Sequence, residues 1–361
     1  MTYLNRDLRV ACKKGDVDSA NITIANGATN WNDGLCWACY SGHVELVNMM
    51  IARGATDWNQ GLHGACYSGH IALVNMMIAR GATDWNQGLF GACEGGHVAL
   101  ANMMIDRGAT DWNGGLHCTC IGGHIGLTNM MIDRGATDWD WSLYNACYGG
   151  HVALANMMIA HGATDWGGCL FAACSGGHVA TAELVIAYGV TDWNGGLRGA
   201  CEYGHITLAN MMIAHGATDW NCGLHYACEG GQVELAKMMI AHGATDWNWG
   251  LRGACYGGHV TLANMMIDRG VTDWNWDAKL YYGSRNMEEY IKAQRKLHDA
   301  KAVPIIRMLR RFIVRMHNAK RIQLWWRGTY PLWRELAYAP PNGLRYRQSL
   351  EHFEKLKILK S

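Results

Sequence analysis

The apolar positions of this chain fall into short groups with helical spacing. In residues 62–88, Leu62, Ala65 and Cys66 stand three and four positions apart, so they share one face of an α-helix. Gly69 follows closely, and glycine readily adopts the left-handed conformation that ends a helix. The pattern therefore predicts a short first helix over residues 62–67.

A second apolar group follows directly. Leu73, Met76 and Met77 share one face of a helix predicted over residues 71–78, which glycine ends at position 81. Residues 83–86, Thr-Asp-Trp-Asn, are expected to form a polar turn that leads into the next helix. A helix pair this small cannot bury its own apolar faces, so it must stack on neighbouring copies.

The same pattern occurs ten times with a period of 27 residues. Gly-Ala-Thr or Gly-Val-Thr returns without slippage from Gly27 to Gly270, and a leucine opens each unit from Leu8 to Leu251. A fixed period over many copies is typical of a solenoid. The sequence predicts an all-α solenoid of ten helix-turn-helix repeats over residues 1–277.

The unit resembles the ankyrin repeat. Residues 65–82 contain a small-residue pair, a Gly-His turn, a Leu-bearing second helix and a closing Gly-Ala, as in that family. The likeness covers all ten units, although Gly15-Asp16 weakens it in the first unit and Gln232 weakens it in the ninth.

The unit also departs from the ankyrin pattern. Ankyrin repeats have about 33 residues and a Thr-Pro-Leu-His-like start, whereas residues are missing here between Gly54 and Leu62. In the family that stretch forms a projecting β-hairpin finger, so we expect the fingers to be reduced to tight Trp-bearing turns. Arrays with Asp-Trp-Asn and this spacing are similar to those of giant DNA viruses of amoebae, which implies a viral source.

Charge divides the chain into two regions. Residues 1–277 carry 12 Lys and Arg against 24 Asp and Glu, whereas residues 278–361 carry 19 Lys and Arg against 6 Asp and Glu. The change falls where the repeats stop, so we place a boundary there. We expect a degenerate cap, with a helix over 287–292, followed by a basic α-helical C-terminal extension.

The extension contains a predicted amphipathic basic helix that opens at Pro304. Such helices bind calmodulin-like proteins, anionic membranes or nucleic acid. Residues 303–327 are therefore a candidate contact region for nucleic acid or an anionic surface. The candidate contacts are Arg307, Arg310, Arg311, Arg315, Lys320, Arg321, Trp325, Trp326 and Arg327.

Other interpretations of the extension stay open. The sequence from Ile322 resembles the first half of an IQ motif, but Pro331 and Leu332 break the second half. The basic helix alternatively docks on the last repeat, or folds back over the acidic array, an effect that salt would weaken.

Three residue types recur once in nearly every unit. The tryptophans, from Trp31 to Trp274, form either a packing ladder along the loop edge or an exposed ridge for peptides or bases. The cysteines of neighbouring units should lie roughly 10 Å apart, too far for a disulfide, so we expect buried packing residues. The histidine of the Gly-His turn is replaced once, by Gln232, which favours a structural hydrogen bond over a metal ligand.

Partner specificity is expected where the units differ. The variation is greatest at two positions early in the first helix and at one position in the turn before it. By resemblance to ankyrin repeats, these positions face the partner on the concave surface. The candidates are Trp37, His63, Phe90, His117, Tyr144, Phe171, Arg198, His225, Tyr226 and Arg252 in the helix, and Trp141, Trp249 and Trp276 in the turn. Their types dominate interface energies, but neutral drift on an exposed face is the alternative.

The sequence offers no enzymatic chemistry. It contains no Gly-rich phosphate loop, His-Glu-x-x-His or nucleophile elbow, and we expect no metal or cofactor. It also lacks a signal-peptide core and any stretch near the roughly 18 apolar residues that span a bilayer, so we expect a cytoplasmic protein, in host cytoplasm if viral. We predict a protein-protein interaction scaffold. The alternatives, both through the extension, are a nucleic-acid-binding protein and a ubiquitin-ligase substrate adaptor, although no convincing F-box is present.

Overall fold

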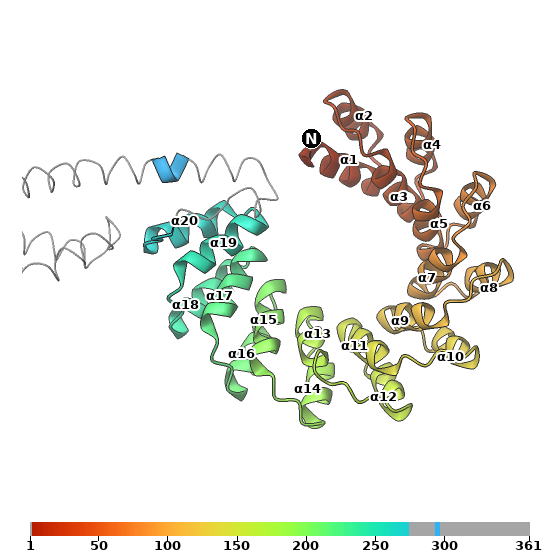
Figure 1. The fold of residues 1–361 in the computed structure, drawn as a ribbon. Coiled ribbons are helices and arrows are strands. Elements are labelled where there is room, and N and C mark those ends of the chain that lie inside the picture. The colour runs from red at the N-terminus through yellow and green to blue at the C-terminus, as the bar shows by residue number, and fades with distance from the viewer. Residues whose placement is uncertain (1, 274–292, 297–361) are drawn as a thin grey trace, which may run out of the picture. The chain divides into compact units, whose positions relative to one another are not determined.

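The computed structural model describes residues 2–273 and 293–296, and these contain helices but no β-strand (Figure 1). Twenty helices form ten pairs. The first helices are α1 (Thr2–Lys14), α3 (Trp31–Ser41), α5 (Trp58–Tyr67), α7 (Trp85–Gly95), α9 (Trp112–Gly122), α11 (Trp139–Gly149), α13 (Cys169–Gly176), α15 (Trp193–Tyr203), α17 (Trp220–Glu229) and α19 (Trp247–Gly257). The second helices are α2 (Val17–Ala25), α4 (Val44–Ala52), α6 (Ile71–Ala79), α8 (Val98–Asp106), α10 (Ile125–Asp133), α12 (Val152–Ala160), α14 (Val179–Ala187), α16 (Ile206–His215), α18 (Val233–His242) and α20 (Val260–Arg269).

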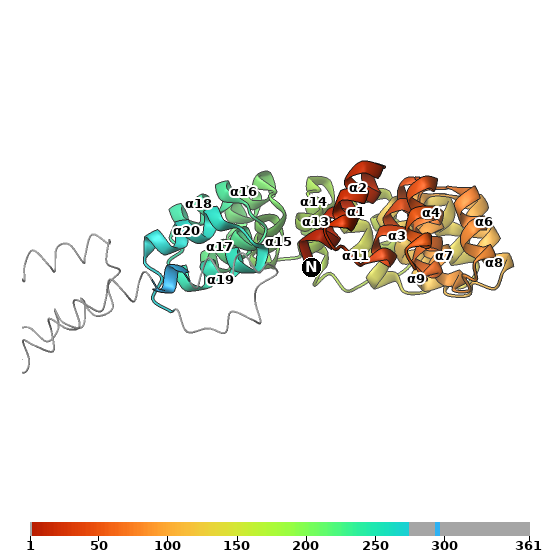
Figure 2. The same cartoon turned by 90° about the horizontal axis from the view of Figure 1, so that it is seen from above.

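The chain divides into two compact parts. The N-terminal part comprises residues 1–200 and 207–217, and the C-terminal part comprises residues 201–206 and the chain from 218 onward. In the N-terminal part, neighbouring pairs lie side by side (Figures 1 and 2), and the first helices α1 to α13 line the concave side of an arc (Figure 1). The predicted all-α fold of ten ankyrin-like helix pairs is confirmed.

Several expectations fall outside the residues that can be described. They concern Trp276, the cap helix over residues 287–292 and the basic candidates within residues 303–327. These expectations stay predictions. Within the described helices, none is long and apolar enough to cross a lipid bilayer.

The first helix of a typical pair begins earlier than the apolar pattern suggests. Helix α7 starts at Trp85, and the side chain of Asp84 caps it by accepting the backbone N–H of Gln87 at 3.1 Å. The prediction of a polar turn over residues 83–86 was therefore wrong, because the aspartate is an N-cap that places Trp and Asn inside the first helical turn. The connection before it is short, with no finger.

The expected helix ends are confirmed. Gly69 follows α5 with a φ of +77°, and Gly81 follows α6 with a φ of +104°. Side chains with a Cβ avoid this left-handed region, so glycine is needed at both turns.

Each pair buries a common set of small and medium side chains. Leu62, Ala65 and Cys66 on α5 and Val74 and Met77 on α6 are fully buried. The ten cysteines equivalent to Cys66 are all buried and free, which confirms their predicted packing role. Burial raises the pKa of the Cys66 thiol to about 12, so this thiol is neutral at physiological pH.

The histidine of the Gly-His turn contacts the preceding pair. The His124 Nε2 atom lies 3.0 Å from the carbonyl oxygen of Glu94, and His151 Nε2 lies 2.9 Å from that of Ile121. A carbonyl only accepts, so Nε2 carries the proton in each case. The structural role is confirmed at these positions, but the bond joins two pairs rather than fixing the histidine's own turn.

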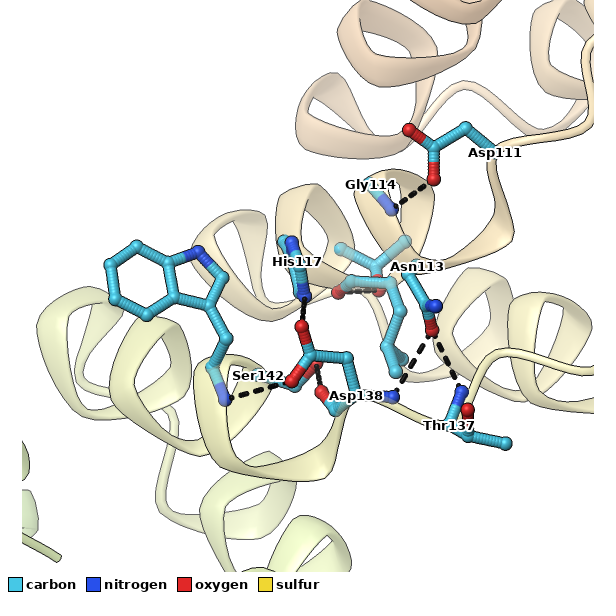
Figure 3. Close-up of polar contacts among 10 residues, drawn as sticks. Asp111, Asn113, Gly114, His117, Thr137, Asp138 and Ser142 are labelled. Atoms are coloured by element: carbon cyan, nitrogen blue, oxygen red, sulfur yellow. Dashed lines mark hydrogen bonds and ion pairs between the residues drawn. The ribbon is translucent and has the colours of Figure 1, made fainter. Parts of the chain in front are cut away.

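A second polar contact ties most first helices to the linker that starts the next one. The Oδ1 atom of Asn86 accepts the backbone N–H groups of Thr110 and Asp111 at 2.9 and 3.0 Å. We call this two-bond contact the linker clamp; Figure 3 shows it at Asn113. The clamp residues with these bonds are Asn5, Asn32, Asn59, Asn86, Asn113, Asp140, Asn221 and Asn248.

Candidate partner-binding surface

The residues that differ between repeats gather mainly on one face of the first helices. In α11, Trp141, Tyr144 and Tyr148 stand three and four positions apart, so they project from the same face. Trp141 is 52% exposed and Tyr148 is 40% exposed, although both are large aromatic residues. In the N-terminal part this face belongs to the helices that line the concave side (Figure 1). We call it the first-helix face.

The third variable position belongs to the helix rather than to the turn before it. Trp141 donates its backbone N–H to the capping Asp138, and Trp249 donates to Asp246, as residues in a first helical turn do. The expectation that Trp141 and Trp249 precede the helix was therefore wrong. Their position one turn before Tyr144 and Arg252 is what places each pair on a common face.

One of the two variable positions early in the helix mostly contacts the preceding first helix. Gly64, Gly91 and Gly253 are buried, and a Cβ added at Gly91 would lie 2.3 Å from the carbonyl oxygen of His63. Glycine at this position lets two first helices approach closely. Of the predicted contacts, Trp37 and Tyr226 occupy this position and stay partly exposed.

An aromatic and cationic cluster lies at the N-terminal end of the first-helix face. Tyr40 stacks on Tyr67 with ring centroids 4.6 Å apart, and Trp37 lies 5.3 Å from Tyr40. The Lys13 ammonium lies 4.8 Å from the Trp37 ring centroid, and the Arg9 guanidinium lies 5.8 Å from it. These are cation–π distances. We call this group the Trp37 cluster.

A second cluster lies further along the N-terminal part. Trp141 and Tyr144 stack almost parallel, with centroids 4.9 Å apart and an angle of 2° between the rings. His117 meets Trp141 edge-on at 6.4 Å. On the next helices, the Arg198 guanidinium lies 4.7 Å from the Phe171 ring centroid. We call Trp141, Tyr144 and His117 the Trp141 cluster.

An ion-pair geometry positions His117 within the Trp141 cluster. His117 Nε2 lies 3.1 Å from Asp138 Oδ2, and the other carboxylate oxygen of Asp138 caps α11 (Figure 3). Burial lowers the pKa of His117, while Asp138 acts in the opposite direction. Asp138 therefore links the imidazole of one pair to the helix start of the next.

The C-terminal part carries its own aromatic group. His225 stacks on Trp249 at 4.7 Å and meets Tyr226 edge-on at 5.0 Å. His225 Nδ1 also lies 2.9 Å from the carbonyl oxygen of Trp249, so that nitrogen is the donor. Arg252 donates to Asp273 at 2.8 Å. Three of the predicted contacts, His225, Tyr226 and Trp249, therefore meet here through direct contacts.

The repeated tryptophans do not form an exposed ridge in the described repeats. The nine described members, Trp31 to Trp247, are each half-buried. One ring face is covered within the same repeat in eight of them: His161 stacks on Trp139 at 4.6 Å, and Arg80 lies 5.6 Å from the Trp58 centroid. The packing interpretation is thus favoured for these tryptophans.

Sequence reasoning missed Tyr40, Tyr67 and Tyr148 as surface candidates. Each stands seven positions after the variable residue of the first helical turn, and two helical turns return a side chain to the same face. The signal was present in the sequence, but it becomes readable only when the helix starts at the tryptophan.

The comparisons with known proteins found similarity among solved structures. No protein-family model and no curated protein matches the chain. The chain is similar to the crystal structure of the human ASB11 ankyrin repeat domain, with 22% sequence identity and a TM-score of 0.33. The similar region covers 44% of this chain and 84% of that one. The fold assignment rests on the helix pairs described above.

Proposed function

We propose that this chain is a non-enzymatic scaffold that binds other proteins through its first-helix face. The observation that carries the proposal is that residues which differ between repeats gather on this face, in a framework that otherwise repeats. The exposure of aromatic side chains such as Trp141 and Tyr148 to water is energetically unfavourable. Trp, Tyr and Arg also dominate binding energies at protein interfaces.

The charges of the face favour a particular kind of partner. Many acidic residues of the array, such as Asp84 and Asp138, cap first helices at the linker edge. The first-helix face of the N-terminal part carries Arg9, Lys13 and Arg198 beside aromatic rings, and Asp33 and Glu94 are acidic residues at equivalent positions of that face. We therefore propose a polypeptide segment with aromatic or aliphatic side chains and acidic residues.

The proposal is tested by affinity capture with the full-length chain, followed by binding measurements on the captured partner. The double variant W141A/Y144A removes the stacked pair, and N129A changes an exposed residue of α10 as a control. We expect the double variant to lose at least about 2 kcal/mol of binding free energy, roughly thirtyfold in affinity. Unchanged affinity in the double variant, or an equal loss in N129A, would contradict the proposal.

A second candidate function concerns nucleic acid. Residues 278–361 carry 19 Lys and Arg against 6 Asp and Glu, and this excess of positive charge favours contact with phosphates. The test compares the full-length chain with the variant R307Q/R310Q/R311Q for binding to single-stranded RNA at two salt concentrations. Weaker, less salt-dependent binding of the variant supports this function, and identical binding curves contradict it.

The remaining proposals rest on resemblance. If the source is a giant virus, the partner is a viral or host protein in the host cytoplasm. A ubiquitin-ligase adaptor function would further require that the extension recruit the ligase, which co-capture of ligase subunits from transfected cells tests directly.

A further inference from the structure

Each linker clamp places a side-chain oxygen at the same position relative to the next linker. In each of the eight clamps named above, one side-chain oxygen accepts two adjacent backbone N–H groups at distances between 2.6 and 3.1 Å. Seven of the eight oxygens belong to asparagine carboxamides, and one belongs to the carboxylate of Asp140. The two amide groups therefore form a small, repeated binding site for an oxygen atom.

The seventh pair lacks the clamp residue. Gly167 occupies the position that asparagine holds elsewhere, and α13 starts at Cys169 rather than at the tryptophan. Asp165 accepts from Gly167 instead of capping the helix. Within the described chain, no hydrogen bond is found from the N–H groups of Thr191 and Asp192, the pair of donors that the missing side chain would satisfy.

A cavity lies where the clamp side chain is missing. It has a volume of about 300 Å³, is open to solvent, and is lined by Trp166, Gly167, Tyr188, Thr191 and Asp192 among others. Trp166 and Tyr188 stack with ring centroids 4.6 Å apart and 13° between the rings, which gives the cavity an aromatic wall. This volume matches the lower range of small-ligand sites and exceeds that of one asparagine side chain.

We propose that this cavity binds an asparagine side chain of a partner polypeptide, whose carboxamide oxygen accepts the N–H groups of Thr191 and Asp192. The inference rests on the proposed scaffold function. The partner would supply the atom that seven other repeats supply themselves, while its adjoining atoms pack against Trp166 and Tyr188. An aspartate would fit as Asp140 does, but less tightly, because the carboxylates of Asp165 and Asp192 flank the site.

The experiment is an amide NMR titration of the deuterated full-length chain. The probe is N-acetyl-asparagine methylamide, and N-acetyl-alanine methylamide is its control. We expect saturable downfield shifts of the Thr191 and Asp192 amide protons with the asparagine probe, because a new acceptor deshields both protons. Equal shifts with the alanine probe would overturn the proposal.

Two variants test the position of the bound oxygen. Gly167→Asn supplies an internal clamp residue and should abolish the response at Thr191 and Asp192. Asn59→Gly removes the clamp that holds Thr83 and Asp84 at 2.9 and 3.0 Å, so those two amides should gain a response. A response that persists in Gly167→Asn, or none in Asn59→Gly, would refute the assignment.

The probe titration tests the cavity and the capture experiment tests the first-helix face, so a negative result in one does not decide the other. The titration needs no partner and changes no residue of the Trp141 cluster. Loss of the NMR response would therefore leave the first-helix face intact as a candidate, and failure of W141A/Y144A would leave the cavity result standing.

Discussion

Replacing Asn86 by alanine removes the linker clamp between α7 and the linker to α9. Two backbone donors, the N–H groups of Thr110 and Asp111, lose an acceptor that lies 2.9 and 3.0 Å away. Each such bond contributes about 1 kcal/mol to the free energy of unfolding. Alanine recovers at most about 0.7 kcal/mol through its higher helix propensity. The net expectation is a loss of about 1–1.5 kcal/mol.

A matched variant separates the clamp from the general effect of the substitution. Asn75 lies on the exposed surface of α6, and no hydrogen bond to its side chain is found among the described residues. Asn75→Ala should therefore change the stability only through helix propensity, which is neutral or stabilising by about 0.5 kcal/mol. The two variants should differ by about 2 kcal/mol although their chemistry is identical.

The assay combines urea unfolding with hydrogen exchange. Solenoids often unfold repeat by repeat, so a single transition does not report one free energy. Hydrogen exchange resolves the site: the Thr110 and Asp111 amides should lose roughly tenfold in protection in Asn86→Ala, which corresponds to about 1.4 kcal/mol. Unchanged protection at these amides, together with an unchanged urea midpoint, would refute the structural importance of the clamp.

Three further predictions follow from packing and titration. Gly91→Ala should lower the free energy of unfolding by about 1–3 kcal/mol, because its Cβ would clash with the backbone carbonyl oxygen of His63, whereas Gly126→Ala, with open space around it, should raise that free energy by about 0.5–1 kcal/mol. Equal shifts of the urea midpoint in the two variants would contradict this. Burial lowers the pKa of His63 below its ordinary 6.5, so the unfolded chain binds more protons than the folded chain, and stability falls as pH drops below 6.5. Between pH 7.5 and 5.5, the melting temperature of H63Q should therefore fall less than that of the unmodified chain. Equal falls in the two proteins would contradict this. Cys66, with its pKa raised to about 12, should resist iodoacetamide at pH 8 and react in urea, as peptide mass spectrometry would measure; fast labelling of the folded chain would disprove its burial.

The sequence predicts the period, the two helices and the buried cysteines because these depend on local spacing alone. It misplaces the start of the first helix because Asp84-Trp85-Asn86 contains residue types that favour turns as well as N-caps. The start of the helix is determined by hydrogen bonds that the sequence pattern does not reveal. Asp84 accepts the backbone N–H of Gln87, and Asn86 accepts the backbone N–H of Thr110 in the next linker. Reading aspartate as an N-cap would have found the correct boundary.

The candidate surface was predictable only in part. Variation between units identifies which positions differ, but not which of two adjacent positions faces solvent. Gly91 is buried against the carbonyl of His63, whereas Tyr148, two helical turns after Trp141, is exposed. Their placement depends on how closely neighbouring first helices approach, and that distance is a property of the packed array rather than of one repeat.

Two kinds of departure from the repeat can be compared, and the difference supports the proposal that the first-helix face is the functional one. Two departures in the buried core are satisfied by neighbouring groups: Ser142 replaces the usual glycine and donates to the carbonyl of Asp138 at 2.6 Å, and Thr181 replaces the usual leucine and donates to the carbonyl of Cys147 at 3.2 Å. Such changes keep the buried groups paired, as stability requires. Trp141 and Tyr148 instead leave aromatic surface in water. Since packing does not require that exposure, it supports the proposal that a partner covers these rings.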